Sequence, residues 1–497
     1  MKLIKLLENI DIIEKVNFDD EIEIGSLCDN SKMATKDCLF FAINGTNTSG
    51  ENYALEAVKN GAKVIICENF IDELCKSGVC QVKVENIRKA VSKVSANFFE
   101  NPCDRLKMIA VVGTNGKTST SHIMYDILTF SSKKVGLIGT NEIIFAGKII
   151  ENDMTTPDPI KLQEILFEMA KEKIEYVVME VSAHAIFLNK VFGIKFEAGI
   201  FTNFSQDHLD FFGTMEKYKS VKVGFFDKEN IKSAVINIDD EAGKEILRKS
   251  NVPVITYGIK NPSDVFAISI SMDLGGSEFI VNYFDEVFNI KSNLTCLFNI
   301  YNLLSCITLC KRLGIETNLI QKAVENISKI GGRFNLINKG QNFNIIVDYA
   351  HTPVALKDLL NNVKMLSKGK IITVFGCPGN RDELKREIMG EIAGENSDYV
   401  ILTSDNPQYE NSYRIMRDIE RGVFKTKCPY KLIDDRREAI SLAMSLASPK
   451  SCVVIVGKGI EKYQNINGEH IEYNDFDEIE RIIKQMKKIK LDNKFLI

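Results

Sequence analysis

The segment that most constrains this chain is Ala110–Ser119. An apolar run, Met108–Val112, leads into a glycine turn, a lysine, two hydroxyl residues and then a helical pattern. A strand followed by a turn whose N–H groups converge on a helix N-terminus forms an anion-binding site. In such a turn Lys117 would contact the outer phosphates of a nucleotide and Thr118 would bind magnesium. Val111 stands where a standard phosphate loop has its first glycine, so an ordinary glycine turn is the alternative.

Length and composition limit the class of protein. A chain of 497 residues is long enough for about three domains of ordinary size. The net charge of −4 argues against a nucleic-acid partner or a basic membrane-binding surface. The first ten residues are too charged for a signal peptide, and the 12 cysteines lack paired spacing. We therefore expect a cytoplasmic monomer with reduced thiols and no membrane span.

Breaks in the chain predict three domains, which cover residues 1–102, 103–329 and 330–497. Asn101-Pro102 marks the first break, and the glycine pair in Ile330–Phe334 marks the second. In the two longer ranges, apolar runs that end in polar residues alternate with helical patterns. This alternation predicts parallel sheets covered by helices, with ligands at the carboxyl ends of the strands. We expect an α/β protein with a small first domain, a central phosphate-loop-like domain, a Rossmann-like last domain, and an active site between the last two.

Three polar positions in the central domain could take part in the chemistry. Glu180 ends an apolar run, where its carboxylate could hold magnesium on a nucleotide or could simply be a charge that leaves the sheet. His208 lies between Asp207 and Asp210 in a chain with only 5 histidines, although a surface loop could look the same. Lys222 lies in a lysine-rich helical run, and most lysines in such runs are only solvated.

Four polar turns follow apolar runs in the last domain and indicate a crevice for a charged small molecule. These turns are Asp348–Pro353, Phe375–Asp382, Ser404–Pro407 and Gly457–Glu461. The second turn contains glycines and could present Arg381 to a carboxylate. Ordinary helix capping is the alternative for all four turns.

Taken together, these segments resemble the Mur ligases, ATP-dependent enzymes that build the peptide stem of bacterial cell-wall precursors. The resemblance covers nearly the whole chain and preserves the order of the motifs. In sequence these are Gly-Thr-Asn-Gly-Lys-Thr-Ser, Glu-Val-Ser, Asp-His-Leu-Asp, Tyr-x-x-x-Lys, Asp-Tyr-Ala-His-Thr-Pro, Phe-Gly-Cys-x-Gly-x-Arg-Asp, Asp-Asn-Pro and Gly-Lys-Gly-x-Glu. The last three motifs point to the member that adds the third residue of the stem.

The resemblance implies a specific reaction. ATP would phosphorylate the side-chain carboxylate of D-glutamate in UDP-MurNAc-L-Ala-D-Glu, and the amine of a free diamino acid would capture the acyl phosphate. Two polyanions have to meet, so magnesium and lysines must offset their repulsion. Water must be kept from the acyl phosphate, which closure of the domains can achieve.

The resemblance also implies roles for individual residues. The catalytic residues would be Lys117, Glu180, His208 and Lys222. The magnesium ligands would be Thr118, Glu180, His208 and Lys222, the last in carbamylated form. The ATP contacts would be Gly113, Thr114, Asn115, Gly116, Lys117, Thr118, Ser119, Asn299, Asn302, Arg333 and Asp348. The contacts to the muramoyl-dipeptide and the diamino acid would be Ser31, Thr155, Thr156, Ser182, Lys190, Arg381, Asp405, Asn406, Gln408, Gly457 and Glu461.

Gln408 departs from the family pattern in an informative way. Members that add diaminopimelate carry arginine there, which can pair in bidentate fashion with the distal carboxylate. A neutral amide gives up that charge-assisted contact, which is typically worth about 1.5–3 kcal/mol. We therefore expect L-lysine in preference to meso-diaminopimelate or another diamino acid.

Two other functions stay open. Folylpolyglutamate synthase resembles the same central and last domains, but it lacks this kind of uridine-binding first domain and the Asp-Asn-Pro turn. A non-catalytic protein that binds ATP only to switch partners would need neither a metal-binding lysine nor a second substrate crevice.

Overall fold

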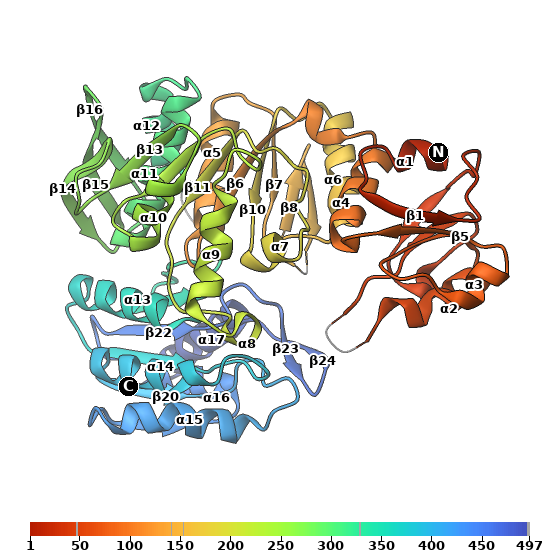
Figure 1. The fold of residues 1–497 in the computed structure, drawn as a ribbon. Helices are drawn as coiled ribbons and strands as arrows, with labels where there is room; N and C mark the ends of the chain where they lie inside the picture. Colours follow the sequence, from red (N-terminus) through yellow and green to blue (C-terminus); the bar gives the residue numbers. More distant parts are fainter. Residues whose placement is uncertain (46–47, 141, 153, 328–329, 495–497) are drawn as a thin grey trace.

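The fold is α/β, as predicted, with three main sheets that follow one another along the chain (Figure 1). The computed structural model describes residues 1–45, 48–140, 142–152, 154–327 and 330–494. The described strands form sheets of five, eleven and six strands and a separate two-stranded hairpin. The domain boundary predicted at residue 329 lies outside the described residues.

The first sheet organises the N-terminal domain. Its elements are α1 (Leu3–Leu6), β1 (Ile12–Val16), β2 (Ser26–Cys28), β3 (Cys38–Phe41), α2 (Ala54–Lys59), β4 (Ala62–Cys67), α3 (Asp72–Lys76), β5 (Cys80–Val84) and α4 (Ile87–Phe98). The strand order is β1-β5-β4-β3-β2, with β1 antiparallel to β5 and the other neighbours parallel. The inner strands β3 and β4 are apolar and buried on both faces apart from Lys63 near the start of β4, as parallel sheets covered by helices require.

The second sheet forms the central domain. Its strands are β6 (Lys107–Val112), β7 (Val135–Ile138), β8 (Glu142–Phe145), β9 (Lys148–Glu151), β10 (Tyr176–Glu180), β11 (Ala198–Phe201), β12 (Ala234–Asn237), β13 (Val254–Gly258), β14 (Val265–Asp273), β15 (Gly276–Tyr283) and β16 (Glu286–Ser292). Its helices are α5 (Lys117–Phe130), α6 (Pro159–Lys171), α7 (Ala183–Phe187), α8 (Leu209–Phe212), α9 (Met215–Phe225), α10 (Glu241–Lys249), α11 (Leu297–Arg312) and α12 (Thr317–Asn326).

The phosphate-loop strand lies in the middle of this sheet. The strand order is β16-β15-β14-β13-β12-β11-β6-β10-β7-β8-β9, and β7, β10, β6, β11, β12 and β13 run in parallel. The strands β14, β15 and β16 pair antiparallel, as the alternation between residues 266 and 290 predicts. Strand β6 is apolar and buried from Met108 onward, so its carboxyl end is held rigidly at the centre of the sheet.

The third sheet forms the C-terminal domain. Its elements are β17 (Asn335–Ile337), β18 (Asn344–Asp348), α13 (Pro353–Leu366), β19 (Ile371–Phe375), α14 (Leu384–Asn396), β20 (Tyr399–Leu402), α15 (Ser412–Phe424), β21 (Tyr430–Leu432), α16 (Arg436–Leu446), β22 (Cys452–Val456), β23 (Tyr463–Ile466), β24 (Glu469–Glu472) and α17 (Asp475–Lys494). The order β17-β18-β22-β19-β20-β21 places β22 between β18 and β19, where a doubly wound sheet binds its ligand. One core contains residues of α13, α14 and α15, and the other contains residues of α16 and α17.

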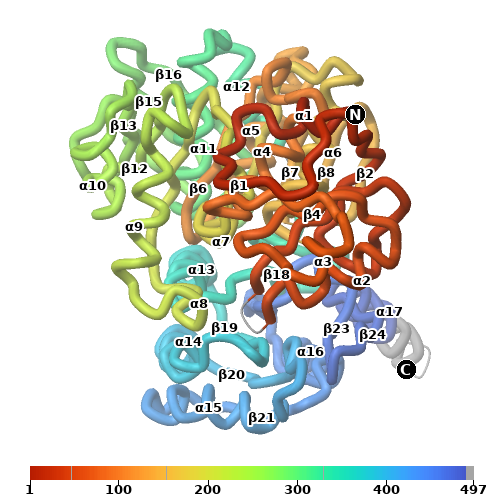
Figure 2. Tube along the Cα trace, turned by 45° about the vertical axis from the view of Figure 1, so that its right-hand side comes forward, coloured from red at the N-terminus to blue at the C-terminus, as the bar shows by residue number. Residues whose placement is uncertain are grey.

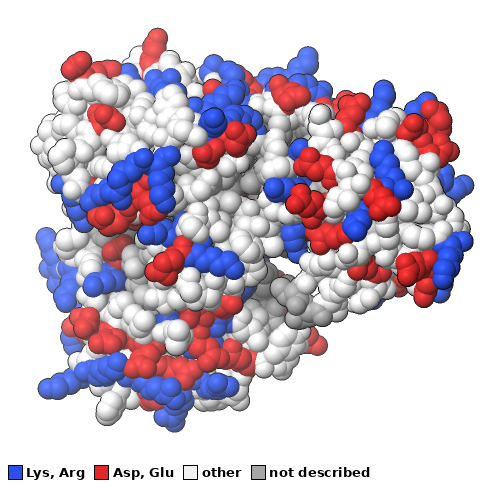
Figure 3. All heavy atoms as spheres, in the orientation of Figure 1, with Lys and Arg blue, Asp and Glu red and all other residues white. Residues whose placement is uncertain are grey.

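The three domains meet around the carboxyl ends of the central strands. The C-terminal domain lies below the central domain in Figure 1, and the first domain lies at its side (Figures 1 and 2). Acidic and basic side chains are mixed over the face shown in Figure 3. In the described part of the chain, no helix combines the length and apolarity needed to cross a bilayer.

Candidate active site

The predicted phosphate loop, residues 113–119, begins in the turn between β6 and α5, the junction that the sequence predicts. Gly113 has no room for a side chain, because a Cβ atom there would lie 1.8 Å from Oγ1 of Thr202. Gly116 has a φ of 82°, a left-handed conformation that glycine adopts without strain. Asn203 fixes the turn by accepting hydrogen bonds from the backbone N–H groups of Thr114 and Asn115, both at 2.9 Å.

Lys117 is folded back over this loop. Its Nζ donates hydrogen bonds to the carbonyl oxygens of Gly113 at 3.0 Å and Thr114 at 2.9 Å. Burial lowers its pKa, while the carboxylates of Glu180 and Asp207 act in the opposite direction. The ammonium group therefore lies over the anion-binding turn, where a phosphate could replace the two carbonyl contacts.

A carboxylate and a hydroxyl meet beside the loop. Oγ1 of Thr118 donates a hydrogen bond of 3.1 Å to Oε2 of Glu180, which is fully buried at the end of β10. Thr140 donates to the same carboxylate from its backbone N and from its Oγ1, both at 3.0 Å. Magnesium at nucleotide sites is usually bound by one or two protein oxygens together with substrate phosphates, and this oxygen pair fits that pattern.

Lys222 is buried under the phosphate loop, so the alternative of a solvated lysine is contradicted. Its residue is 1% exposed, and its Nζ contacts Oγ1 of Thr114 at 2.8 Å and the hydroxyl of Tyr218 at 2.7 Å. Burial lowers the pKa of Lys222 well below its ordinary value of 10.5, and the charge of Lys117 lowers it further. A neutral amine is the form that can react with carbon dioxide, so this environment fits a carbamylated lysine.

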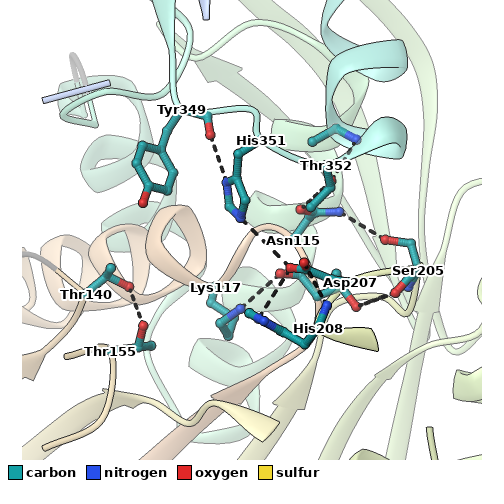
Figure 4. A network of polar contacts seen from close by, with 12 residues as sticks. Asn115, Lys117, Thr140, Thr155, Ser205, Asp207, His208, Tyr349, His351 and Thr352 are labelled. Carbon is teal, nitrogen blue, oxygen red and sulfur yellow. Dashed lines mark hydrogen bonds and ion pairs between the residues drawn. The ribbon is translucent and has the colours of Figure 1, made fainter. Parts of the chain in front are cut away.

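His208 stands between the central and C-terminal domains (Figure 4). Its Nε2 lies 3.4 Å from Oδ2 of Asp207, and Asp207 lies 3.9 Å from Nε2 of His351 in the C-terminal domain. The ring of His184 packs edge-on against the ring of His208, with centroids 4.6 Å apart. Burial lowers the pKa of His208 to about 3, despite the opposing charge of Asp207. The imidazole is therefore neutral, the form that binds metal ions.

These metal-ligand candidates lie in two separate places around the loop. Among the residues that the structure describes, no three His, Cys, Asp or Glu side chains cluster as a metal site. The hydroxyl–carboxylate pair of Thr118 and Glu180 is one place, and the surroundings of His208 are the other. Carboxylate and hydroxyl oxygens are the ligands that magnesium prefers, whereas a neutral imidazole is a more usual ligand of transition-metal ions.

The predicted nucleotide contacts are brought together from two domains. In α11, Oδ1 of Asn302 accepts a hydrogen bond of 3.2 Å from Thr120, and Asn299 lies one turn earlier. From the C-terminal side, Nη2 of Arg333 donates to Oγ1 of Thr118 at 3.2 Å. Asp348 at the end of β18 accepts two backbone hydrogen bonds of 2.7 Å, from Phe334 and Ala350. Arg333 and Asp348 thus stand where the last domain faces the loop.

The predicted contacts to the muramoyl-dipeptide fall into two groups. In the central domain, Oγ1 of Thr156 donates a hydrogen bond to the carbonyl oxygen of Glu180 and accepts one from the backbone N–H of Ser182. The hydroxyl of Thr140 donates to the hydroxyl of Thr155 at 3.3 Å. Lys190 pairs with Asp158 at 2.7 Å. Ser31 belongs to the first domain, where its Oγ donates to Glu56 at 2.5 Å.

The amino-acid turn, defined as Asp405–Gln408 with Gly457–Glu461, is held within the C-terminal domain. Oε2 of Glu461 accepts hydrogen bonds from Asn406 at 2.9 Å and from Lys458 at 2.7 Å. Gly457 packs so closely that a Cβ atom would lie 2.4 Å from Oδ2 of Asp405. The backbone of Gln408 pairs with the hairpin of β23 and β24, and its φ is 53°. Arg381 is exposed on the neighbouring turn.

Sequence reasoning missed some residues that the fold places in the site. Thr140 lies two residues after the end of β7, so its position at the carboxyl end of a parallel strand was a usable signal. His351 belongs to the Asp348–Pro353 turn, but only the packing of the C-terminal domain brings its Nε2 to 3.9 Å from Oδ2 of Asp207.

Comparison with known proteins agrees with this geometry. Residues 111–310 match the family model of the Mur ligase middle domain, and residues 332–459 match the Mur ligase, glutamate ligase domain. A curated relative from Caldanaerobacter subterraneus subsp. tengcongensis is 39% identical over 488 residues, which cover 98% of this chain and 100% of the relative. The chain belongs to the Mur ligase family.

The relatives also indicate which branch of the Mur ligases this chain resembles. The Caldanaerobacter protein is named UDP-N-acetylmuramoyl-L-alanyl-D-glutamate--2,6-diaminopimelate ligase, and a Clostridioides difficile protein of that name is 38% identical over 491 residues, covering 98% of this chain and 100% of the relative. A solved structure of that name has a TM-score of 0.68 and 27% identity, and covers 98% of this chain and 100% of its own. This Mur ligase is therefore an enzyme that forms C–N bonds, and the resemblance to the members that add the third stem residue is confirmed.

Proposed function

We propose that this Mur ligase joins meso-diaminopimelate to the D-glutamate of UDP-MurNAc-L-Ala-D-Glu, with conversion of ATP to ADP and phosphate. Relatives that match nearly the full length of the chain carry names that specify diaminopimelate. They favour this amino acid over L-lysine, which the neutral Gln408 alone would suggest. A glutamine amide still offers a donor to the distal carboxylate, although without a full charge.

The observation that carries the proposal is the contact of two domains around one hydroxyl. Thr118 follows the phosphate loop, donates to Glu180, and accepts a hydrogen bond from Arg333 of the C-terminal domain. A nucleotide between these groups would have its terminal phosphate directed into the gap between the domains. That gap is also bordered by the amino-acid turn, so the phosphorylated carboxyl group and the incoming amine can meet there.

Each part of the chain has a definite task in this proposal. The first domain, residues 1–102, would bind the UDP group through Ser31, and Thr155, Thr156, Ser182 and Lys190 would hold the dipeptide. Lys117 and the N–H groups of the loop would bind and orient the ATP phosphates. Asp405, Asn406, Gln408, Gly457, Glu461 and Arg381 would orient the diamino acid. Closure of residues 330–497 over residues 103–329 would keep water from the activated carboxyl group.

The residues also fit magnesium and a carbamylated lysine. Thr118 and Glu180 would hold one magnesium ion with the nucleotide, and His208 and carbamylated Lys222 would hold a second. The metal would offset the negative charge of the two anions. Tyr218 and Thr114 already direct hydroxyl groups at Nζ of Lys222, and these could donate hydrogen bonds to a carbamate.

The proposal is tested by a side-by-side assay of product formation. Purified protein would receive ATP, magnesium, UDP-MurNAc-L-Ala-D-Glu and, separately, meso-diaminopimelate, L-lysine and L-ornithine. We expect the highest kcat/KM with meso-diaminopimelate and a new amide by mass spectrometry. More efficient use of L-lysine would refute the amino-acid assignment, and no amide with any amine would refute the ligase reaction. A folate in place of the muramoyl-dipeptide tests the folylpolyglutamate synthase alternative in the same assay.

The role of Lys222 has its own test. Lys222→Ala should abolish amide formation, and added bicarbonate should not restore it, because no amine is left to carbamylate. Lys217→Ala changes an exposed lysine on the same helix and is the matched control. Unchanged turnover in Lys222→Ala would refute the carbamate.

A further inference from the structure

Lys458 is a fully buried cation inside the amino-acid turn. It follows β22, and none of its side chain is exposed. Its Nζ donates hydrogen bonds to Oδ1 of Asn406 at 2.9 Å and to Oε2 of Glu461 at 2.7 Å. Asn406 is partly exposed, and the side chain of Glu461 is 20% exposed. A ligand can therefore reach Asn406 and Glu461, but it cannot reach the ammonium group that holds them.

These contacts join the two segments of the amino-acid turn. Nδ2 of Asn406 also donates to Oε2 of Glu461, at 2.9 Å, so each of the three side chains is bonded to the other two. Asn406 comes from the turn after β20, whereas Lys458 and Glu461 come from the turn after β22. The ammonium group fixes the position of Glu461, because separating the two would leave a buried charge without compensation.

The amide of Asn406 is held in one orientation. Its Oδ1 accepts hydrogen bonds from Nζ of Lys458 and from the backbone N–H of Asn465, both at 2.9 Å. The reversed amide would place its NH₂ group against these two donors, so that orientation is excluded. Nδ2 gives one hydrogen to Glu461, and among the residues that the structure describes it finds no second acceptor. One amide N–H is therefore left for an acceptor on a ligand, such as a carboxylate.

Glu461 has the complementary free position. Lys458 and Asn406 both contact its Oε2. In the described part of the chain, Oε1 is contacted only by the hydroxyl of Tyr349, at 3.4 Å. A carboxylate oxygen accepts more than one hydrogen bond, so Oε1 can bind an ammonium group. A free donor beside a free acceptor matches one centre of an amino acid, which carries a carboxylate and an ammonium group on the same carbon.

We propose that Lys458 is a positioning residue that determines which diamino acid is used. It holds Asn406 and Glu461 so that their free donor and free acceptor bind the carboxylate and the ammonium group of one amino-acid centre. This inference rests on the ligase reaction proposed above and adds to it the residue that organises the amino-acid turn.

The centre bound in this way is the one that does not react. An amine must be unprotonated to attack the acyl carbon, so an ammonium group held by Glu461 belongs to the other end of the diamino acid. meso-Diaminopimelate has a carboxylate and an ammonium group at that end. L-Lysine that reacts through its α-amine has only the ammonium group there. The pair organised by Lys458 therefore favours meso-diaminopimelate even though position 408 is neutral.

The test compares three variants of the full-length protein. Lys458→Met removes the charge and both hydrogen bonds, Lys458→Gln keeps one donor, and Lys431→Met changes an exposed lysine of β21 as the control. We expect Lys458→Met to raise the KM for meso-diaminopimelate about 10- to 100-fold, the range of one charge-assisted hydrogen bond, with the KM for ATP within a few-fold of wild type. The KM for L-lysine should rise less, because L-lysine has no distal carboxylate. Lys458→Gln should give a smaller rise, and Lys431→Met should match wild type.

Hydroxylamine separates a positioning role from a structural one. It attacks the acyl carbon of the activated muramoyl-dipeptide and displaces phosphate, so a hydroxamate forms without any diamino acid. Both variants at position 458 should form hydroxamate at a rate within a few-fold of wild type. Lys458→Met leaves the carboxylate of Glu461 without its cation and should also lower the melting temperature. If that variant does not fold, Lys458→Gln, which keeps a donor, decides the test.

Two results would overturn the inference. The first is a KM for meso-diaminopimelate that stays constant or falls in the folded variants, and a fall would mean that Lys458 only offsets the charge of Glu461. The second is loss of hydroxamate formation in both variants, which would show that Lys458 has only a structural role. Wild-type protein that forms neither hydroxamate nor amide would instead refute the proposed ligase reaction, so the two failures are distinct.

Discussion

The phosphate loop and the amino-acid turn are built in different ways. The loop is contacted by two domains, since Arg333 and Thr352 reach Thr118 and Asn115 from the C-terminal side. The amino-acid turn is held by Lys458, Glu461 and the hairpin of β23 and β24, all of one domain. Nucleotide binding should therefore depend on how the domains meet, whereas the choice of amino acid should be a local property of the C-terminal domain.

The largest effect is expected at the phosphate loop itself. Lys117→Ala removes the ammonium group that lies over the loop, and the loss of a preorganised cation should lower kcat about 1,000-fold. The measurement is ADP release with saturating muramoyl-dipeptide and diamino acid. Lys134→Ala, at an exposed position after α5, should leave the rate unchanged. A loss of less than tenfold would mean that the loop does not hold the transferred phosphate.

A gain of function is expected at the amino-acid turn. Gln408→Arg introduces a guanidinium group that can pair with a distal carboxylate, so kcat/KM for meso-diaminopimelate should rise about 10- to 100-fold. L-lysine has no distal carboxylate, so its kcat/KM should not rise. The KM for ATP should also stay constant if the turn acts locally. An equal gain for both amino acids would contradict the placement of Gln408 near the distal end.

A smaller effect is expected where the two domains touch. Arg333→Ala removes the hydrogen bond to Thr118, so the KM for ATP should rise about tenfold, the range of one charge-assisted hydrogen bond. The KM for the diamino acid should change little, because the amino-acid turn is held without Arg333. Arg414→Ala, an exposed arginine of α15, is the control. A change in the KM for the diamino acid as large as the change in the KM for ATP would contradict the independence of the amino-acid turn from the domain contact.

The smallest effect concerns pH. Burial lowers the pKa of His351 from its ordinary value of 6.5 to about 4, so between these values the unfolded chain binds more protons than the folded one. Burial of neutral His351 therefore does not reduce the free energy of unfolding above about pH 6.5, and it reduces that free energy increasingly as the pH falls towards 4. His351→Asn should therefore show a shallower fall in melting temperature than wild type over this range. An identical fall in both proteins would show that other groups dominate.

The sequence was sufficient for the fold class, the family and the strand–turn–helix junction between β6 and α5. These features depend on local patterns, namely apolar runs that end in glycine or polar residues and the Gly-Lys-Thr junction. The burial of Lys222 could not be predicted from such local patterns. Its helix carries exposed lysines at neighbouring positions, and only the approach of Thr114, more than a hundred residues away in sequence, removes it from water.

The side chain at position 408 does not by itself determine which amino acid this ligase adds. Loss of an arginine is a real loss of charge, but the relatives named for diaminopimelate favour the opposite choice. The backbone of Gln408 is fixed by hydrogen bonds with the backbones of Asn465 and Asn467, and its side-chain amide remains a possible donor to a carboxylate.

The contact between Gly113 and Thr202 restricts how this chain can drift over evolutionary time. Oγ1 of Thr202 would lie 1.8 Å from a Cβ atom at position 113, and the same hydroxyl is tied to the carbonyl of Asn115 at 2.7 Å. Alanine at position 113 is therefore inaccessible as a first step. Lineages that carry it should already have alanine or glycine at position 202, so the two positions should change together and in that order.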